Sequence, residues 1–331
     1  MGSTPLVGVD IGTSAVKVVA FPRRRPVRWS VVPLPDGTIS EKQVQQPEAV
    51  ATALRTALGE LGRVSRRAAL AVGGAAVMTR QWRLPAELED EDLEARVRGE
   101  AASALPFDPD RVYLDFQVLG PDPEDAGLQQ VLLAASRADQ VDGRLEAVRE
   151  AGLRPALVDL ESFALEQSAA GLARRGQAVA VADIGATSLT IALAGDGEGH
   201  FSRSQALSGT PLAAALATAR ETTRAEAEAA LHHGEAPPDE LLTPFTEAVA
   251  AQLKRLLPLA EEQAGRAADR LVLAGGGALT PGLVAALRES FPVPVALARP
   301  LSREGDEASA GLRHIEPGLA VAAALARRRP A

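Results

Sequence analysis

Two short segments of this chain combine aspartate, glycine and hydroxyl side chains at the same spacing. The first reads Asp10-Ile11-Gly12-Thr13-Ser14 after an apolar stretch, and the second reads Asp183-Ile184-Gly185-Ala186-Thr187 after another. Each is followed by a further apolar stretch, a pattern that predicts a β-hairpin with a tight turn at the glycine. We expect the glycine to supply a turn geometry forbidden to other residues and to let a ligand approach the backbone closely.

The chemistry available to such turns is the binding of anions and metal ions. Successive amide N–H groups in the turn form a nest for an anion, and the aspartate at the strand end can hold a divalent cation, usually through water. One such turn alone is as often structural as functional. Two copies in matching context favour the functional interpretation, in which the hairpins face each other and enclose a metal-bound polyphosphate.

A third glycine segment, Gly275-Gly276-Gly277-Ala278-Leu279, follows the apolar stretch 271–274. It predicts a buried strand that runs into a glycine turn and then a helix. Glycines at this place would let a flat base or ribose lie against the backbone. The segment is not a Walker loop, because no Gly-Lys-Ser/Thr follows, and it lacks the Gly-x-Gly-x-x-Gly spacing of a dinucleotide site.

The elements that must position these residues are predicted from apolar periodicity and from turn signals. Before the second turn they are strands at 16–21 and 27–32, a helix at 47–61, a strand at 67–72, a break at Gly73-Gly74 and a compact β-α-β-β-α insert at 75–152. After it they are strands at 189–194 and 200–206, helices at 224–232 and 240–263, and the strand and helix around the triple glycine.

Composition narrows the class of protein. A chain of 331 residues that is 46% hydrophobic and 24% charged is long enough for two α/β lobes with buried cores. It has no cysteine, which is compatible with the cytoplasm, and its net charge of −8 argues against broad nucleic-acid binding. No apolar run approaches the roughly 20 residues that span a bilayer. The N-terminus enters a predicted strand almost at once, so we expect no signal peptide.

In these motifs the chain resembles the actin-like ATPase superfamily, which includes actin, sugar kinases, DnaK chaperones, MreB and FtsA. The segments 158–164 and 315–322 are similar to the two connecting helices of that family. The resemblance implies a two-lobed α/β actin-like ATPase (ribonuclease H-like) fold that binds ATP or ADP with Mg²⁺. It implies a metal between Asp10 and Asp183, with Glu161 or Asp183 orienting a water molecule. The implied nucleotide contacts are Gly12, Thr13, Ser14 and Lys17 for the first phosphate loop, Gly185, Ala186 and Thr187 for the second, and Gly275, Gly276, Gly277, Leu279 and Glu228 for the nucleoside.

The insert narrows the resemblance to FtsA and to the PilM proteins of type IV pilus assembly, which place a small module of this kind before the first connecting helix. The similarity to PilM lies in the order of Leu84-Pro85, an acidic stretch at 87–94, Pro106-Phe107 and a strand at 112–118. The expected division is a first lobe of 1–74, 153–178 and 311–331, an inserted interaction subdomain of 75–152, and a second lobe of 179–310 with a nucleotide-binding helical part at about 218–267.

One segment departs from the family pattern. The helix after Arg224 normally carries a glutamate and then a lysine that flank the nucleoside. Glu226 and Glu228 are both candidates for the acid, but no lysine follows; His232 and His233 stand there instead. This places nucleotide affinity in question. A histidine pair at the end of a helix is more often solvated than bound to a base.

Three functions are compatible with these observations. The first is a nucleotide-binding adaptor that resembles PilM, recruits the cytoplasmic N-terminal tail of a PilN-like inner-membrane protein and lies at the inner face of the cytoplasmic membrane through that partner. Pilus motor ATPases and a second copy of the chain are further candidate partners for this adaptor.

The second function is that of an FtsA-like division protein that forms membrane-tethered filaments. The third is a phosphotransfer enzyme of the sugar-kinase or exopolyphosphatase type, for which the first lobe offers no base in the expected loop. Basic clusters at Arg23–Arg25 and Arg327–Arg329 could attract anionic lipid, although solvated charge is the more ordinary explanation.

Overall fold

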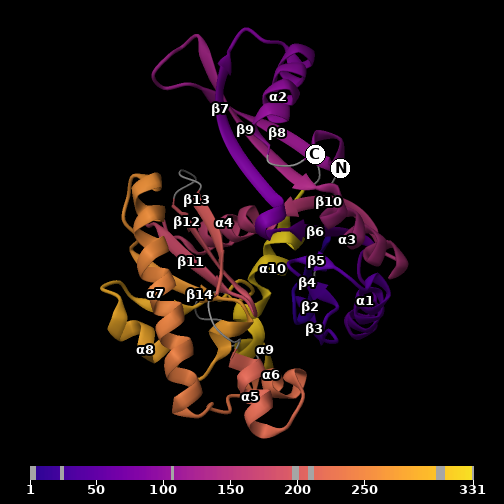
Figure 1. Ribbon diagram of the computed structural model, residues 1–331, viewed down its shortest axis with the longest axis vertical. Coiled ribbons are helices and arrows are strands. Elements are labelled where there is room, and N and C mark those ends of the chain that lie inside the picture. Colours follow the sequence, from indigo (N-terminus) through magenta and orange to yellow (C-terminus); the bar gives the residue numbers. More distant parts are fainter. Residues whose placement is uncertain are drawn as a thin grey trace.

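A computed structural model describes residues 5–22, 26–105, 108–195, 201–207, 212–302 and 310–329. The chain forms two lobes side by side, and a smaller unit projects from the first (Figure 1). Of the segments interpreted above, Arg23–Arg25 and Pro106-Phe107 lie outside the described residues. Within them, no helix is both long enough and apolar enough to cross a membrane.

The first lobe is built on a five-stranded sheet with the strand order β10-β6-β1-β2-β3. Its first three strands form an antiparallel meander, and the other two run parallel to β1. The strands are β1 (Val7–Ile11), β2 (Ala15–Ala20), β3 (Arg28–Pro33), β6 (Arg67–Val72) and β10 (Arg154–Leu160). The helices α1 (Pro47–Leu61) and α3 (Ala138–Glu150) cover one face, and α10 (Ala320–Arg327) lies across the other. As predicted, α1 begins at Pro47 and ends at Gly62, whose φ is +65°.

The second lobe repeats this plan with the strand order β13-β12-β11-β14-β15. An antiparallel meander again opens the sheet, and the remaining strands run parallel to its first strand. The strands are β11 (Val179–Ile184), β12 (Ser188–Ala194), β13 (Phe201–Ala206), β14 (Arg270–Ala274) and β15 (Val295–Leu297). The long helix α7 (Asp239–Ala264) covers one face, and α4 (Glu161–Leu172) covers the other. Both faces of β11 are therefore buried, which explains its nearly continuous apolar sequence.

The remaining helices complete the second lobe and the connection back to the first. Beside the lower end of α7 in Figure 1 lie α5 and α6, and α8 packs against α7 and β15. The bounds are α5 (Leu212–Arg220), α6 (Arg224–His232), α8 (Leu283–Ser290) and α9 (Ala310–Ile315). The chain then returns between the lobes as α10, so α4 and α10 are the two helices that connect them.

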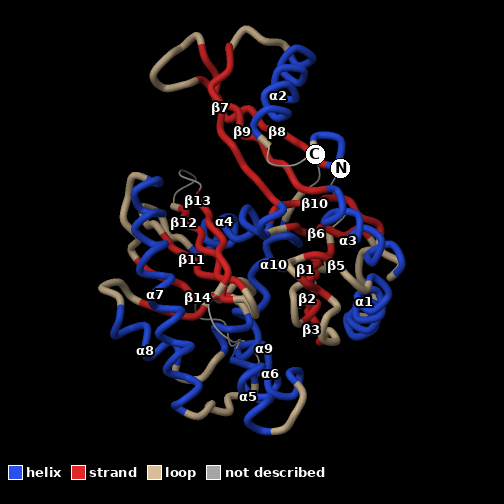
Figure 2. The backbone as a smooth tube through the Cα atoms, in the orientation of Figure 1, coloured by secondary structure: helices blue, strands red, loops and turns tan. Residues whose placement is uncertain are grey.

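The insert is a three-stranded antiparallel sheet, ordered β7-β9-β8, with one helix on a single face (Figure 2). Its elements are β7 (Val77–Pro85), α2 (Asp90–Ala104), β8 (Val112–Pro121) and β9 (Leu128–Arg137). Leu93 and Val97 of α2 pack on Val131 and Leu133 of β9. The next helix, α3, follows in the expected β-α-β-β-α order but packs mainly on α1, so its apolar residues join the core of the first lobe.

Candidate functional site

The first hairpin places Asp10 and Lys17 side by side. They are cross-strand partners in the ladder of β1 and β2, and Lys17 Nζ lies 3.1 Å from Asp10 Oδ2. The Gly12 N–H donates to the Ala15 carbonyl at 3.0 Å, which closes the turn. Gly12 does not have a positive φ, so the predicted need for a turn geometry forbidden to other residues is wrong, while the close approach of a ligand stays a prediction. The reason is crowding instead, because an added Cβ would lie 3.1 Å from the Ala15 carbonyl oxygen.

The second hairpin has the same geometry. The Gly185 N–H donates to the Ser188 carbonyl at 2.8 Å, and Gly185 also lacks a positive φ. A Cβ on Gly185 would lie 3.2 Å from that carbonyl oxygen, so the same correction applies. Asp183 sits near the end of β11 beside β14, the strand that leads into the triple glycine. The hairpin and the glycine loop are therefore adjacent by sheet register.

The three glycines of the loop have different surroundings. Gly275 has a φ of +84°, and a Cβ there would lie 2.4 Å from the Ile184 carbonyl oxygen; a Cβ on Gly277 would lie 2.5 Å from Ile184 Cγ2. These two glycines allow the loop to pack directly on the second hairpin. Among the described residues, a Cβ on Gly276 would meet no atom closer than His232 Nε2, at 3.6 Å. Within that part of the chain, Gly276 therefore faces open space in the cleft.

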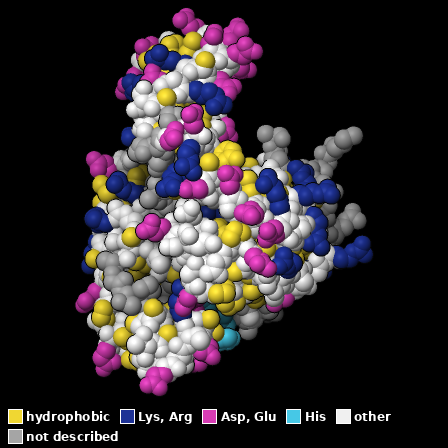
Figure 3. All heavy atoms as spheres, turned by 45° about the vertical axis from the view of Figure 1, so that its right-hand side comes forward, with side chains coloured by type: hydrophobic (Ala, Val, Ile, Leu, Met, Phe, Trp, Pro, Cys, Tyr) yellow, Lys and Arg dark blue, Asp and Glu magenta, His cyan; other side chains and the backbone are white. Residues whose placement is uncertain are grey.

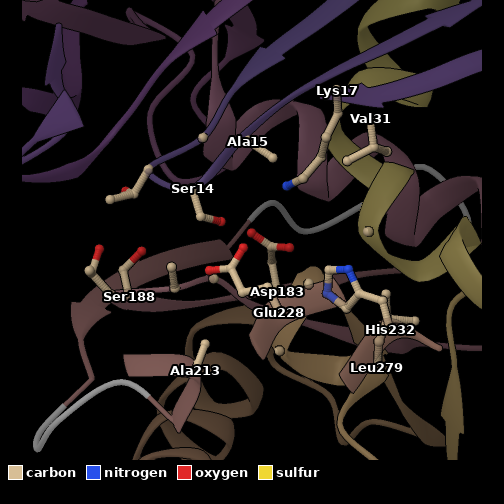
Figure 4. A pocket seen from close by; sticks show the side chains of 18 of the residues that line it. Ser14, Ala15, Lys17, Val31, Asp183, Ser188, Ala213, Glu228, His232 and Leu279 are labelled. Carbon is tan, nitrogen blue, oxygen red and sulfur yellow. The ribbon is translucent and has the colours of Figure 1, made fainter. Parts of the chain in front are cut away.

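Both hairpins and the glycine loop line one cleft between the lobes, together with the start of α4 and the inner side of α6. Figure 4 shows Ser14 and Lys17 of the first lobe pointing toward Asp183, Glu228 and His232 of the second. Of the residues predicted for the site, all but Gly275 line this cleft. They are Asp10, Gly12, Thr13, Ser14, Lys17, Glu161, Asp183, Gly185, Ala186, Thr187, Glu228, Gly276, Gly277 and Leu279.

Burial and charge shift the protonation of the groups in the cleft. Burial raises the pKa of the Asp183 carboxyl to about 6; Lys17 opposes this shift, and Asp10 adds to it. Burial alone would lower the pKa of the Lys17 ammonium, but Asp10 and Asp183 more than offset it, so that pKa lies above its usual value. Asp183 is thus a carboxylate held in a site that favours its neutral form, and a cation would relieve this cost.

Lys42, which sequence reasoning missed, is a further cation of the cleft. Its Nζ lies 2.9 Å from Glu161 Oε2 at the start of α4. Burial would raise the pKa of the Glu161 carboxyl, but Lys42 and then Arg144 bring it below its usual value. Lys42 occupies the tip of a two-residue hairpin between β4 (Ile39–Ser40) and β5 (Gln43–Val44). Glu41 and Lys42 both have positive φ, as a type I′ turn requires.

The break at Gly73-Gly74 has a specific role beside this ion pair. A Cβ on Gly73 would lie 2.4 Å from Glu161 Oε2, and a Cβ on Gly74 would lie 2.9 Å from Lys42 Cγ. The two glycines therefore leave the space that the ion pair fills. A sequence signal for Lys42 did exist, because only three of the 35 basic residues are lysines and each of them stands out. Two of the three, Lys17 and Lys42, line the cleft.

Arg144 of α3 is fully buried, and its charge acts on Glu161. Its Nη1 donates to the carbonyl and the side-chain oxygen of Gln140, at 3.0 and 3.1 Å. Its Nε and Nη2 have no hydrogen-bond partner within the described residues. Burial lowers the pKa of this guanidinium, and Glu161 is the largest opposing influence. Glu161 thus lies in the field of two cations, one at the cleft and one beneath the insert.

The end of α6 supplies the far wall of the cleft. Glu226 forms a capping box with Thr223 and is exposed, whereas Glu228 faces the cleft. Burial raises the pKa of the Glu228 carboxyl, and Arg224 and the Ser14 hydroxyl oppose the shift. Arg224 also lies 2.7 Å from Asp36 of the first lobe. An ion pair therefore crosses from α6 to the first lobe.

The two histidines at the end of α6 have different surroundings. His232 lines the cleft beside Gly276, and burial lowers the pKa of its imidazole, which favours the neutral ring. The Nδ1 of His233 lies 2.7 Å from the Ala229 carbonyl oxygen, and this residue does not line the cleft. His232 therefore stands where the family pattern described above has a lysine on this helix. Its neutral imidazole offers the cleft a flat ring instead of a positive charge.

Comparison with known proteins identifies the family to which the chain belongs. A family model described as type IV pilus assembly protein PilM matches residues 8–330. The chain is similar to a solved structure titled PilM-PilN type IV pilus biogenesis complex, with a TM-score of 0.80 and 29% identity over 98% of both chains.

Two further solved structures show the fold alone. EutJ, an ethanolamine utilization protein from Carboxydothermus hydrogenoformans, has a TM-score of 0.57 and 15% identity over 98% of this chain and 90% of its own. MreB 5 of Spiroplasma citri, bound to AMPPNP, has a TM-score of 0.51 and 12% identity over 98% and 95%. The predicted actin-like fold is thus confirmed.

Proposed function

This chain belongs to the PilM family of type IV pilus assembly proteins, and from that premise we propose that it is an actin-fold adaptor that binds ATP or ADP with Mg²⁺ and recruits the cytoplasmic N-terminal tail of a PilN-like inner-membrane protein. One observation carries the proposal. The chain matches a PilM protein solved in a complex with PilN over 98% of both chains. The match includes the insert, so the surface that distinguishes this family from other actin-like proteins is present here.

The chemistry of the cleft supports nucleotide and metal binding. Lys17 and Lys42 bring positive charge, and the turns at Gly12 and Gly185 offer backbone N–H groups to phosphate oxygens. Among the described residues there is no cluster of three or more acidic, histidine or cysteine side chains for a metal. That suits Mg²⁺, which is usually held by one or two carboxylates, phosphate oxygens and water. Asp183 and Asp10 would be those carboxylates, and the ion would neutralise phosphate charge.

The nucleoside would lie against the glycine loop. Gly276 faces open space, His232 offers a flat neutral ring beside it, and Leu279 adds an apolar contact. Glu228 would accept hydrogen bonds from the ribose. For hydrolysis, Glu161 and Asp183 are the candidates to orient water, but Glu161 is already paired with Lys42. We therefore propose a protein that mainly holds nucleotide and turns it over slowly, if at all.

The tail would bind as an extended peptide where the insert meets the first lobe. Strand β8 lies at the edge of its sheet and, within the described residues, pairs only with β9, so its other side offers backbone groups for strand addition. The large apolar side chains exposed on β8 are Tyr113, Val118 and Leu119. Tyr113 also donates a hydrogen bond to Asp142 of α3, at 3.0 Å, so this strand reaches the first lobe. Binding there would hold the protein at the inner face of the membrane.

The test is a titration of a fluorescent synthetic peptide. The peptide is the cytoplasmic N-terminal tail of a candidate single-span membrane protein, and a scrambled peptide is the control. We expect saturable binding by the full chain, and we expect Tyr113→Lys/Leu119→Lys to weaken it tenfold or more, about 1.4 kcal/mol. Leu259→Lys, at an exposed leucine on α7, is the matched variant that should bind normally. Equal affinity for the scrambled peptide would refute the adaptor role.

A further inference from the structure

One edge of the first lobe carries a concentration of arginine that the proposed function does not use. We call it the arginine edge; its members are Arg55, Arg63, Arg66, Arg67, Arg149 and Arg154. Two acidic residues, Glu60 and Glu150, lie in the same segments. The whole chain has a net charge of −8, so this edge is opposite in sign to the molecule as a whole.

The arginines come from separate elements that the fold brings together. The Arg154 N–H donates to the Arg66 carbonyl at 2.7 Å, and Arg154 is the ladder partner of Arg67. Arg55 of α1 donates to the Glu150 carbonyl at the end of α3, at 3.3 Å. A hollow in this surface is lined by Arg55, Leu58, Gly59, Arg66, Ala151 and Gly152. The edge is therefore one continuous surface.

The arginine edge lies at the opposite end of the sheet from the cleft. Strands β1, β6 and β10 run parallel, and Asp10 stands near the cleft end of β1. Arg67 and Arg154 are the first residues of β6 and β10, so they mark the other end. Lys and Arg side chains gather at the right-hand edge of the molecule in Figure 3, on the first lobe. A partner at this edge would leave the cleft open.

These side chains are available to a partner. All six are exposed or half-buried, and within the described ranges none lies within 4.0 Å of a carboxylate oxygen. Their charges are therefore not neutralised in the folded protein. The planar guanidinium fork matches phosphate geometry and can donate two parallel hydrogen bonds to it. An anionic phosphate surface is the partner that fits.

We propose that the arginine edge rests on the anionic phospholipid headgroups of a membrane surface. This role rests on the proposed function only in that the partner tail places the protein beside a membrane. A flat membrane meets only the edge that faces it, whereas a long nucleic acid would also meet the acidic remainder of the molecule and be repelled. Each basic residue near such a surface contributes about 1 kcal/mol, so several arginines give a useful second attachment beside the tail.

The experiment measures co-sedimentation of the full chain with lipid vesicles, without any peptide. Vesicles of phosphatidylcholine with and without phosphatidylglycerol separate headgroup charge from general adsorption. We expect binding only to the anionic vesicles, weakened by added salt. Arg63→Glu/Arg66→Glu should lower the partition coefficient at least about 25-fold, because each lost arginine costs about fivefold at 1 kcal/mol and each new glutamate is repelled by the lipid. Arg149→Glu/Arg154→Glu should give a loss of the same order.

The matched control is Arg203→Glu/Lys254→Glu, which makes the same change of charge at exposed positions of the second lobe. An equal loss in the control, binding to neutral vesicles, or no binding to any vesicle would overturn the proposal. Binding of an oligonucleotide that the edge variants abolish, without vesicle binding, would assign the edge to nucleic acid instead. The tail titration is done in solution without lipid, so either result can fail independently of the other.

Discussion

Lys42 and Glu161 are 119 residues apart in the chain, and their charged groups lie 2.9 Å apart in the wall of the cleft. The pair joins a two-residue hairpin of the first lobe to the first residue of the connecting helix α4. Both side chains are largely buried, with 19% and 15% of their surface exposed. Removing one partner of such a pair leaves an uncompensated charge in a place with little water.

We therefore expect Lys42→Met to destabilise the empty protein by about 2–4 kcal/mol, because Glu161 loses its nearest cation. Chemical denaturation measures the change in the free energy of unfolding. The double variant Lys42→Met/Glu161→Gln removes the stranded charge as well and should recover most of the loss. If the double variant loses as much as the sum of the single variants, the pair contributes nothing to folding through its contact.

Asp183 makes stability depend on pH. Its pKa is raised to about 6 in the folded protein, so the folded state holds its proton more tightly than the unfolded chain does. The stabilisation is fully present below about pH 4, the ordinary range of an aspartate, and is lost as the pH rises through about 6. Asp183→Asn should remove this contribution to the slope and raise the free energy of unfolding at pH 7.5 by about 1–3 kcal/mol. Unfolding curves of both proteins from pH 4 to 8 test this. If the free energy of unfolding depends on pH in the same way for both, folding does not raise the pKa of the Asp183 carboxyl.

Both hairpin aspartates should be needed for binding of the metal–nucleotide complex. Asp10→Ala or Asp183→Ala is expected to weaken the affinity for Mg²⁺-ATP by well over tenfold, more than about 1.4 kcal/mol, because each carboxylate would contact the metal or its water. Isothermal titration calorimetry with and without Mg²⁺ measures the loss. The metal role would be wrong if both variants bind Mg²⁺-ATP as the natural chain does.

The glycine loop allows a comparison between neighbouring positions. Gly276→Val should fold normally, because a Cβ there meets only His232, at 3.6 Å, but its side chain should occupy the space for the nucleoside and abolish ATP binding. Gly277→Val should lower the melting temperature, because a Cβ there would lie 2.5 Å from Ile184 Cγ2. Melting curves and nucleotide titrations on both variants separate the two effects. A Gly276→Val protein with normal affinity would remove the nucleoside from this loop.

Much of the fold was predictable because its signals are local. A hairpin needs two apolar stretches and a short turn, and all of these lie within 16 residues around Gly12 and again around Gly185. The order of the motifs then implied the two lobes. The reason for Gly277 was not local, because the crowding there depends on Ile184, which belongs to another strand.

The rest of the site depends on contacts between distant segments, which no pattern along the chain reports. Lys42 lies in a turn of two non-glycine residues with positive φ, where a lysine usually means an exposed loop. Arg144 reads as an ordinary charge on a helix until α3 is seen to pack on the first lobe and bury it. The glycines at 73 and 74 marked a break, but their purpose is evident only with Glu161 in place.

The scarcity of lysine has a practical consequence for anyone who labels this protein. Amine-reactive dyes and cross-linkers have few targets: the terminal amine, Lys254 on α7, and the two ammonium groups of the cleft. Lys17 and Lys42 both have a raised pKa, so they hold their protons and react slowly even where reagent reaches them. Mild acylation would therefore mark the terminal amine and Lys254 and leave the interlobe chemistry intact, giving tethering points already built into the natural sequence.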